Sequence, residues 1–127
     1  MSLKQRKRIF VSFPMENEDK KNLFIGMARN NSVPYDFIDM SLKEPFDEKW
    51  KTQCRQRIRS CDGLITLISS YTRKADGQRW EIQCALHEEV PVLGVWIGRS
   101  RYQPPELKRH KPVVWKWEPI RRFLNKL

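Results

Sequence analysis

The feature that most constrains the fold is a continuous, largely apolar run at residues 63–68, Gly-Leu-Ile-Thr-Leu-Ile. A run of strand length without polar alternation is typical of a strand buried on both faces of a parallel sheet. Stretches with apolar residues at helical spacing flank it at residues 47–60 and 79–89. Because parallel strands are joined by helical crossovers, this arrangement predicts an α/β domain.

The same alternation runs through the rest of the chain. Further strands are predicted at residues 8–13, 35–39, 90–97 and 112–115, and further helices at residues 19–29 and from Glu118 onward. Five strands in 127 residues indicate a flavodoxin-like, doubly wound parallel sheet of order 2-1-3-4-5, in three α/β/α layers. We expect a single domain over residues 1–127, with residues 1–6 as a flexible basic tail.

The composition narrows the classes of partner and compartment. The chain has 25 Lys plus Arg against 15 Asp plus Glu, a net charge of +10, which indicates an anionic partner. No apolar stretch approaches the roughly 20 residues that span a bilayer, and no apolar segment of a signal peptide follows the basic start. We therefore expect a cytoplasmic protein without a membrane partner. Its three cysteines form no Cys-x-x-Cys pair, so no metal site is expected.

In doubly wound sheets, ligands bind beyond the carboxyl ends of the strands. That rule makes Ser12, Phe13, Asp39 and Ser70 candidate substrate-binding residues, since each follows or ends a predicted strand. Phe13 would stack on a base or a nicotinamide ring, or would close the core. Ser and Asp are also ordinary residues of turns and caps at strand exits, so both interpretations of the polar residues stay open.

The strand ends exclude three common functions of this fold. The loop at residues 14–19 contains no glycine but holds Glu16, Glu18 and Asp19, whose charges would repel the phosphates of a dinucleotide or of FMN. Ser69 and Ser70 stand where a response-regulator receiver has its phosphoacceptor aspartate.

The third predicted helix, at residues 79–89, contains the remaining candidate functional residues. On a helical wheel, Glu81 falls at the edge of the face that meets the sheet, and Trp80, Cys84 and His87 point away from the sheet. Glu81 is then either a first-turn carboxylate favoured by the helix dipole or a functional group. The Trp80 face is either a self-assembly surface or a groove covered by the loop at residues 98–111.

Three segments carry a family resemblance: residues 58–68, residues 80–86 with Trp80-Glu81-Ile82 at their start, and residues 90–95. In this order they resemble the TIR-like family, and more narrowly the TIR-like proteins of the bacterial Thoeris antiphage system. Residues 10–13 are similar to the family's first strand, and the resemblance spans roughly residues 7–97. The chain departs from the pattern at Gly77, where many TIR NAD+ hydrolases have a tryptophan.

The resemblance implies an NAD+ hydrolase or ADP-ribosyl cyclase that breaks the nicotinamide–ribose bond and makes a linear or cyclic ADP-ribose signal in antiphage defence. It implies that Glu81 is catalytic and that Trp80 lies beside the substrate. NAD+ would be the substrate, with no further cofactor. A homo-oligomer formed through TIR–TIR contacts and a separate effector protein that senses the product are also implied.

Two other classes of function stay open. A non-enzymatic TIR-like signalling or assembly module would keep the fold and self-association and would tolerate loss of Glu81. A basic nucleic-acid-binding domain is supported by the charge alone, because the sequence has no RNP-type aromatics, recognition-helix signature or zinc knuckle.

Overall fold

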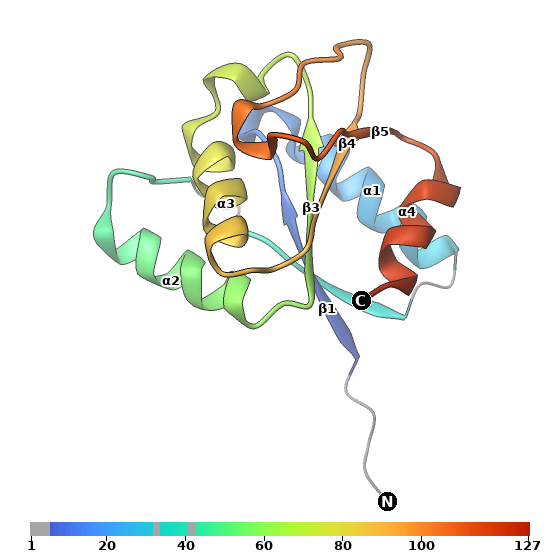
Figure 1. The fold of residues 1–127 in the computed structure, drawn as a ribbon, viewed down its shortest axis with the longest axis horizontal. Coiled ribbons are helices and arrows are strands. Elements are labelled where there is room, and N and C mark those ends of the chain that lie inside the picture. The colour runs from blue at the N-terminus through green and yellow to red at the C-terminus, as the bar shows by residue number, and fades with distance from the viewer. Residues whose placement is uncertain (1–5, 32–33, 41–42) are drawn as a thin grey trace, which may run out of the picture.

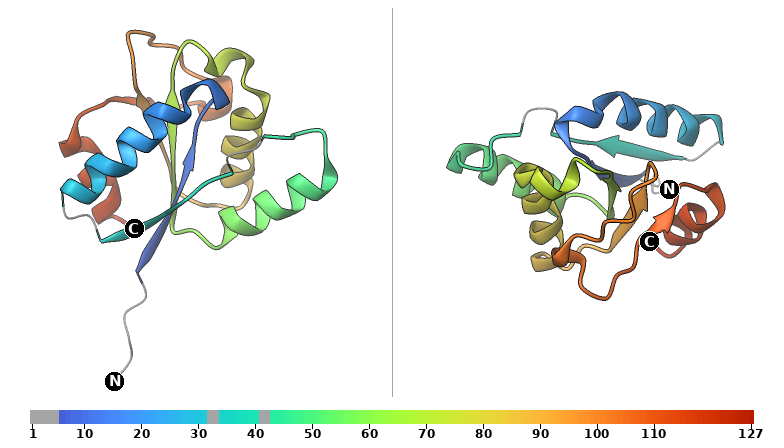
Figure 2. Two further views of the ribbon diagram at one scale, coloured as in Figure 1. Left: turned by 180° about the vertical axis from the view of Figure 1, so that it is seen from behind. Right: turned by 90° about the horizontal axis from the view of Figure 1, so that it is seen from above.

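The computed structural model describes residues 6–31, 34–40 and 43–127. Within them lies a five-stranded parallel sheet of order β2-β1-β3-β4-β5, with helices on both faces (Figure 1, Figure 2). This arrangement confirms the predicted doubly wound α/β fold. The predicted flexible tail, except for Arg6, lies outside the described residues.

The elements follow one another as the alternating pattern predicts. The strands are β1 (Lys7–Ser12), β2 (Tyr35–Ile38), β3 (Gly63–Ile68), β4 (Val92–Trp96) and β5 (Val113–Val114). The helices are α1 (Glu18–Asn30), α2 (Glu48–Arg59), α3 (Asp76–His87) and α4 (Trp117–Asn125). Short 3-10 helices lie at Met15–Asn17, Thr72–Lys74 and Pro105–Leu107.

Strand β3 forms the centre of the sheet, as its apolar run predicts. Every residue of β3 is buried, and Ile65 is paired in register with Val11 of β1 on one side and Leu93 of β4 on the other. Because all pairings are parallel, the carboxyl ends of β1, β3 and β4 meet at one edge of the sheet. That edge is where the candidate site residues were expected.

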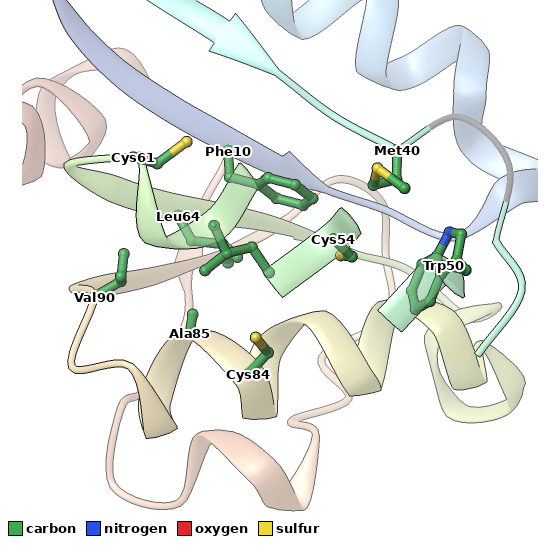
Figure 3. Close-up of a cluster of buried hydrophobic side chains, with 10 residues drawn as sticks. Phe10, Met40, Trp50, Cys54, Cys61, Leu64, Cys84, Ala85 and Val90 are labelled. Carbon is green, nitrogen blue, oxygen red and sulfur yellow. The ribbon is translucent and has the colours of Figure 1, made fainter. Parts of the chain in front are cut away.

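Two hydrophobic clusters attach the helices to opposite faces of the sheet. On the first face, α2 and α3 pack on β1 and β3 through a cluster that includes Phe10, Trp50, Cys54, Leu64 and Ala85 (Figure 3). On the second face, α1 and α4 cover a cluster that includes Ile9, Val11, Phe24, Ile65 and Ile120. The alternation of Phe10 with its neighbours in β1 thus distributes side chains between the two layers.

Two boundaries differ from the prediction for physical reasons. Helix α3 begins at Asp76 rather than at residue 79, so part of the predicted polar loop at residues 69–78 is helical. Buried hydrogen bonds from Gln78 Nε2 to Thr66 Oγ1 (2.8 Å) and to the Leu67 carbonyl oxygen (2.7 Å) hold this first turn against β3. Strand β5 keeps only Val113–Val114, because within the described residues it pairs only with Val95 and Trp96 at the end of β4.

Candidate functional site

A buried carboxylate lies at the carboxyl edge of the sheet, between β1 and α3. Glu81 has no exposed surface. The Ser12 hydroxyl donates a hydrogen bond of 2.8 Å to Oε1, and the ammonium group of Lys43 lies 2.6 Å from Oε2. Since α3 starts at Asp76, Glu81 lies in the second turn of the helix, so the interpretation as a first-turn dipole charge was wrong.

The surroundings of Glu81 act on its pKa in opposite directions. Burial raises the pKa of Glu81 above its usual value, because a charged carboxylate loses its hydration. The Lys43 ammonium and the Ser12 hydroxyl oppose this effect, since both stabilise the charged form, whereas the charge of Asp39 adds slightly to the increase in pKa. Burial, and then the charge of Glu81, also raise the pKa of the Cys54 thiol, whose sulfur lies 4.0 Å from Oε2.

Two lysine side chains lie against the ring of Phe13. The ammonium of Lys43 is 4.4 Å from the ring centroid, and that of Lys21, on α1, is 5.3 Å from it. Each lysine is also paired with a carboxylate. The ammonium nitrogen of Lys21 lies 3.1 Å from Asp39 Oδ2, and that of Lys43 lies 2.6 Å from Glu81 Oε2. The aromatic face and the two carboxylates therefore form an environment suited to cations.

A pocket of about 230 Å³ opens beside this group. Its lining includes Phe13, Lys43, Phe46, Gly77 and Gln78. The side chain of Gln78 is 1% exposed, and its Oε1 has no hydrogen-bond partner among the described residues. Because the Nε2 atom already donates twice to β3, the remaining oxygen offers an acceptor beside the pocket for an N–H or O–H group.

Gly77 accounts for the way in which Lys43 reaches the carboxylate. A Cβ atom at position 77 would lie 2.7 Å from the Cβ of Lys43, which is closer than such atoms approach one another. The aliphatic chain of Lys43 thus lies in the space that a larger residue at position 77 would need.

The other expected residues lie further from Glu81. Ser70 is exposed beyond β3, in a separate pocket of about 300 Å³ with Lys20 and Arg99. Trp80 packs edge-on against Trp50 of α2, with ring centroids 5.3 Å apart, and does not line the Phe13 pocket. Helix α2 covers part of the Trp80 face. The pocket beside Trp80 is lined by residues of α2 and of α3 with Glu88, and no residue of the loop at residues 98–111 lines it, although one interpretation of the sequence placed that loop over this face.

Three residues close to Phe13 and Glu81 were not predicted from the sequence as site residues: Lys21, Lys43 and Gln78. Lys43 follows β2 at the same edge of the sheet as Asp39, which is the one signal that could have drawn attention to it. Nothing in the pattern of α1 distinguishes Lys21 from its neighbour Lys20. Gln78 was assigned to a loop, which concealed its contact with β3.

The described part of the chain contains no group of three or more His, Cys, Asp or Glu residues placed to hold a metal ion. Over the same residues, no helix has both the length and the apolar character needed to cross a bilayer.

Residues 10–102 match the model of the family described as Thoeris protein ThsB, TIR-like domain. The chain belongs to this family. The matched segment runs from β1 past the end of β4 and thus contains Ser12, Lys43 and Glu81. Helix α4 of this TIR-like domain lies outside it.

Solved structures agree with the family at the level of the fold. The TIR domain of the Toll-related receptor TRR-2 from Hydra magnipapillata is 13% identical, with a TM-score of 0.64 over 93% of this chain and 92% of that one. A prokaryotic SEFIR domain is 15% identical, with a TM-score of 0.58 over 94% and 88%. The TIR domains of the activated Roq1 resistosome are 17% identical, with a TM-score of 0.51 over 75% and 60%. No curated protein sequence matches the chain significantly.

Proposed function

We propose that this TIR-like domain is an NAD+ hydrolase or ADP-ribosyl cyclase in which Glu81 is the catalytic residue. One observation carries the proposal: within a chain of the Thoeris TIR-like family, a single carboxylate is held at the carboxyl edge of the sheet by Ser12, beside a pocket lined by an aromatic ring. Doubly wound folds bind their ligands at this edge.

The reaction needs only one of the two carboxylates at this edge of the sheet, Glu81, to act on the substrate. The bond between the ribose carbon and the nicotinamide nitrogen breaks with both electrons going to nitrogen, so nicotinamide leaves as a neutral molecule and needs no general acid. The ribose is left with oxocarbenium character, which a nearby anion stabilises. Water then adds to the carbon and loses a proton, giving ADP-ribose. In cyclisation, a nucleophilic atom of the same substrate replaces water, and its proton is lost instead.

In this proposal Glu81 holds the ribose hydroxyls and offsets the developing positive charge. Phe13 is fully buried and part of the hydrophobic core, with the Lys43 ammonium over its ring, so its ring meets the nicotinamide only after Lys43 has moved away. Gln78 Oε1, which is buried and has no partner among the described residues, accepts a hydrogen bond from the substrate once the side chains that cover it have moved. Asp39 takes part through Lys21, which it orients toward the Phe13 ring. NAD+ is the substrate, and we propose no additional cofactor.

The cellular part of the proposal follows from the family. We propose a cytoplasmic enzyme that acts in antiphage defence and whose linear or cyclic product is sensed by a separate effector protein. Assembly of several copies through TIR–TIR contacts belongs to the same proposal. Among the similar structures, the Roq1 TIR domains belong to an activated resistosome.

The direct test is incubation of the purified protein with NAD+, followed by chromatography of nicotinamide and of linear and cyclic ADP-ribose. We expect release of nicotinamide together with one ribosyl product in equal amount. An assembled protein that leaves NAD+ intact would contradict the proposal and favour a non-enzymatic signalling module. Salt-sensitive binding to DNA or RNA in that same preparation would favour a nucleic-acid-binding domain.

Replacing Ser12 with Ala should move the acidic limb of the pH–rate profile to higher pH. The hydroxyl stabilises the ionised carboxylate, so its loss raises the pKa of Glu81 further and lowers the ionised fraction at any given acidic pH. The profile of kcat/KM for NAD+ measures the shift. The control is Ser60→Ala at the end of α2, where the exposed hydroxyl donates to the Arg57 carbonyl oxygen, away from Glu81. An unchanged profile in the Ser12 variant would exclude a role for this hydrogen bond.

A further inference from the structure

Glu81 is inaccessible to any ligand in the conformation described. The carboxylate has no exposed surface, and the side chain that covers it, Lys43, is itself only 4% exposed. On the side of β1, the Ser12 hydroxyl donates a hydrogen bond to the other carboxylate oxygen, Oε1. A substrate can therefore reach Glu81 only if Lys43 leaves it.

Lys43 occupies a site that is built for a cation. Its ammonium group lies 2.6 Å from a carboxylate oxygen of Glu81 and 4.4 Å from the centre of the Phe13 ring. A carboxylate and an aromatic face together bind a flat organic cation as well as they bind an ammonium group. The substrate of the proposed reaction carries such a cation in its pyridinium ring, and it develops positive charge at the ribose as the bond breaks.

The path of the Lys43 chain depends on the glycine at position 77. With the Cβ position of residue 77 only 2.7 Å from the Cβ of Lys43, any other residue at this place would push the lysine aside. The lysine stem is flexible, with four methylene groups, so the ammonium can leave the carboxylate while the backbone stays in place. Gly77 and Lys43 both line the 230 Å³ pocket, so the displaced ammonium has open space beside it.

We propose that Lys43 is an internal competitor of the substrate: its ammonium holds the catalytic carboxylate closed, and the substrate's pyridinium cation must displace it. This proposal rests on the proposed function and adds the regulation of its site. Closure of this kind lowers the apparent affinity for the substrate by the fraction of molecules in which the carboxylate is free. Anything that draws Lys43 away, such as an anionic group of a neighbouring subunit, would activate the enzyme.

A binding experiment without turnover tests the competition directly. The probes are methylnicotinamidium, a pyridinium cation with a methyl group in place of ribose, and nicotinamide, its neutral counterpart. Both are titrated by NMR into the wild type and into Lys43→Met, at a pH high enough to ionise Glu81. Because open states are commonly populated at about 1–10%, we expect the variant to bind the cation about tenfold or more tightly, with little change for nicotinamide.

Gly77→Ala is a second variant that keeps both charged groups. Its methyl group would lie 2.7 Å from the Cβ of Lys43, an atom fixed to the backbone, so the backbone at residue 43 must shift and carry the ammonium away from Glu81. We therefore expect a gain in affinity for methylnicotinamidium in this variant too. Lys126→Met, which removes an equal charge from the exposed end of the chain, is the control and should behave as the wild type. If Lys43→Met fails to fold, as judged by circular dichroism, Gly77→Ala decides the question.

Kinetics separate this proposal from the proposed function. On the alkaline plateau of the rate profile, the Lys43 and Gly77 variants should show a lower KM for NAD+ than the wild type. Unchanged or weaker binding of the cation in both variants would overturn the competition and identify Lys43 as a structural or substrate-holding group. If every variant leaves NAD+ intact, the proposed reaction fails, and the cation titrations still decide what Lys43 does.

Discussion

Replacing Glu81 with Gln should lower the rate of nicotinamide release from NAD+ by about 10³-fold or more, since the substitution removes the charge that stabilises the oxocarbenium-like state. Glutamine has nearly the same shape, and its oxygen can still accept the hydrogen bond from Ser12. The shape of the side chain and its contact with Ser12 are therefore kept, while its negative charge and its ion pair with Lys43 are lost. Measurement of nicotinamide release over a range of NAD+ concentrations separates kcat from KM.

The control is Glu88→Gln, at the residue that follows the same helix, where the carboxylate pairs with Arg59 instead of facing the pocket. We expect this variant to keep wild-type activity. Glu81→Gln also leaves the Lys43 ammonium buried without a counter-charge, which destabilises a fold by about 3 kcal/mol. The double variant Glu81→Gln with Lys43→Met removes both charges, so it should regain stability and remain inactive. Turnover by the folded double variant would show that Glu81 is not catalytic.

The fold was predictable because its strongest signals are local in sequence. The run at residues 63–68 predicts a doubly covered strand, and β3 is wholly buried. The spacing of Trp50, Cys54 and Ile58 predicts the buried face of α2. The start of α3 was not predictable in the same way, because Gln78 is fixed there by hydrogen bonds to β3, and a contact between separate elements leaves no periodic trace in the sequence.

The candidate site was predictable only in part, for a similar reason. Ser12 and Phe13 end a strand, and Glu81 lies on the helix that meets the same edge, so topology alone brings the three together. Lys43 reaches Glu81 through a long side chain whose path depends on Gly77. To predict this contact, one must know how the segments that carry Lys43 and Gly77 run in three dimensions. A lysine and a glycine at these positions in the sequence do not by themselves indicate the contact.

The burial of Lys43 and Lys21 also changes what the excess of positive charge means. Both ammonium groups are paired with carboxylates at the edge of the sheet, one with Glu81 and the other with Asp39. They neutralise acidic groups of the chain itself, so the net charge of +10 does not mark this edge as a binding surface for nucleic acid. In the proposed enzyme, displacement of one such pair makes room for a cation rather than for an anion.

The stability of the domain should depend strongly on the other face of the sheet, and above all on Phe24. Its side chain is fully buried between α1, β2 and the segment that enters α4. The ring lies edge-on to Phe37, with centroids 6.2 Å apart, and within 6.3 Å and 6.1 Å of the rings of Trp115 and Trp117. These neighbours come from two distant segments, with Phe37 on β2, Trp115 just before α4 and Trp117 at its start, so one side chain connects α1 with β2 and with the entry to α4.

Phe24→Ala should lower the free energy of unfolding by about 3–5 kcal/mol, because the change removes buried apolar contacts and leaves a cavity between aromatic rings that cannot all move inward. Small domains are stable by only about 5–15 kcal/mol, so the loss is large. Urea titration followed by tryptophan fluorescence measures it, provided that the slope of the transition is unchanged. The matched control is Leu23→Ala, one residue earlier on α1, where the side chain is 50% exposed. That change should alter the stability by about 0.5 kcal/mol or less, because alanine is itself the best helix former and little apolar surface is lost. An equal loss in both variants would mean that the aromatic cluster beneath α1 is not the source of the effect.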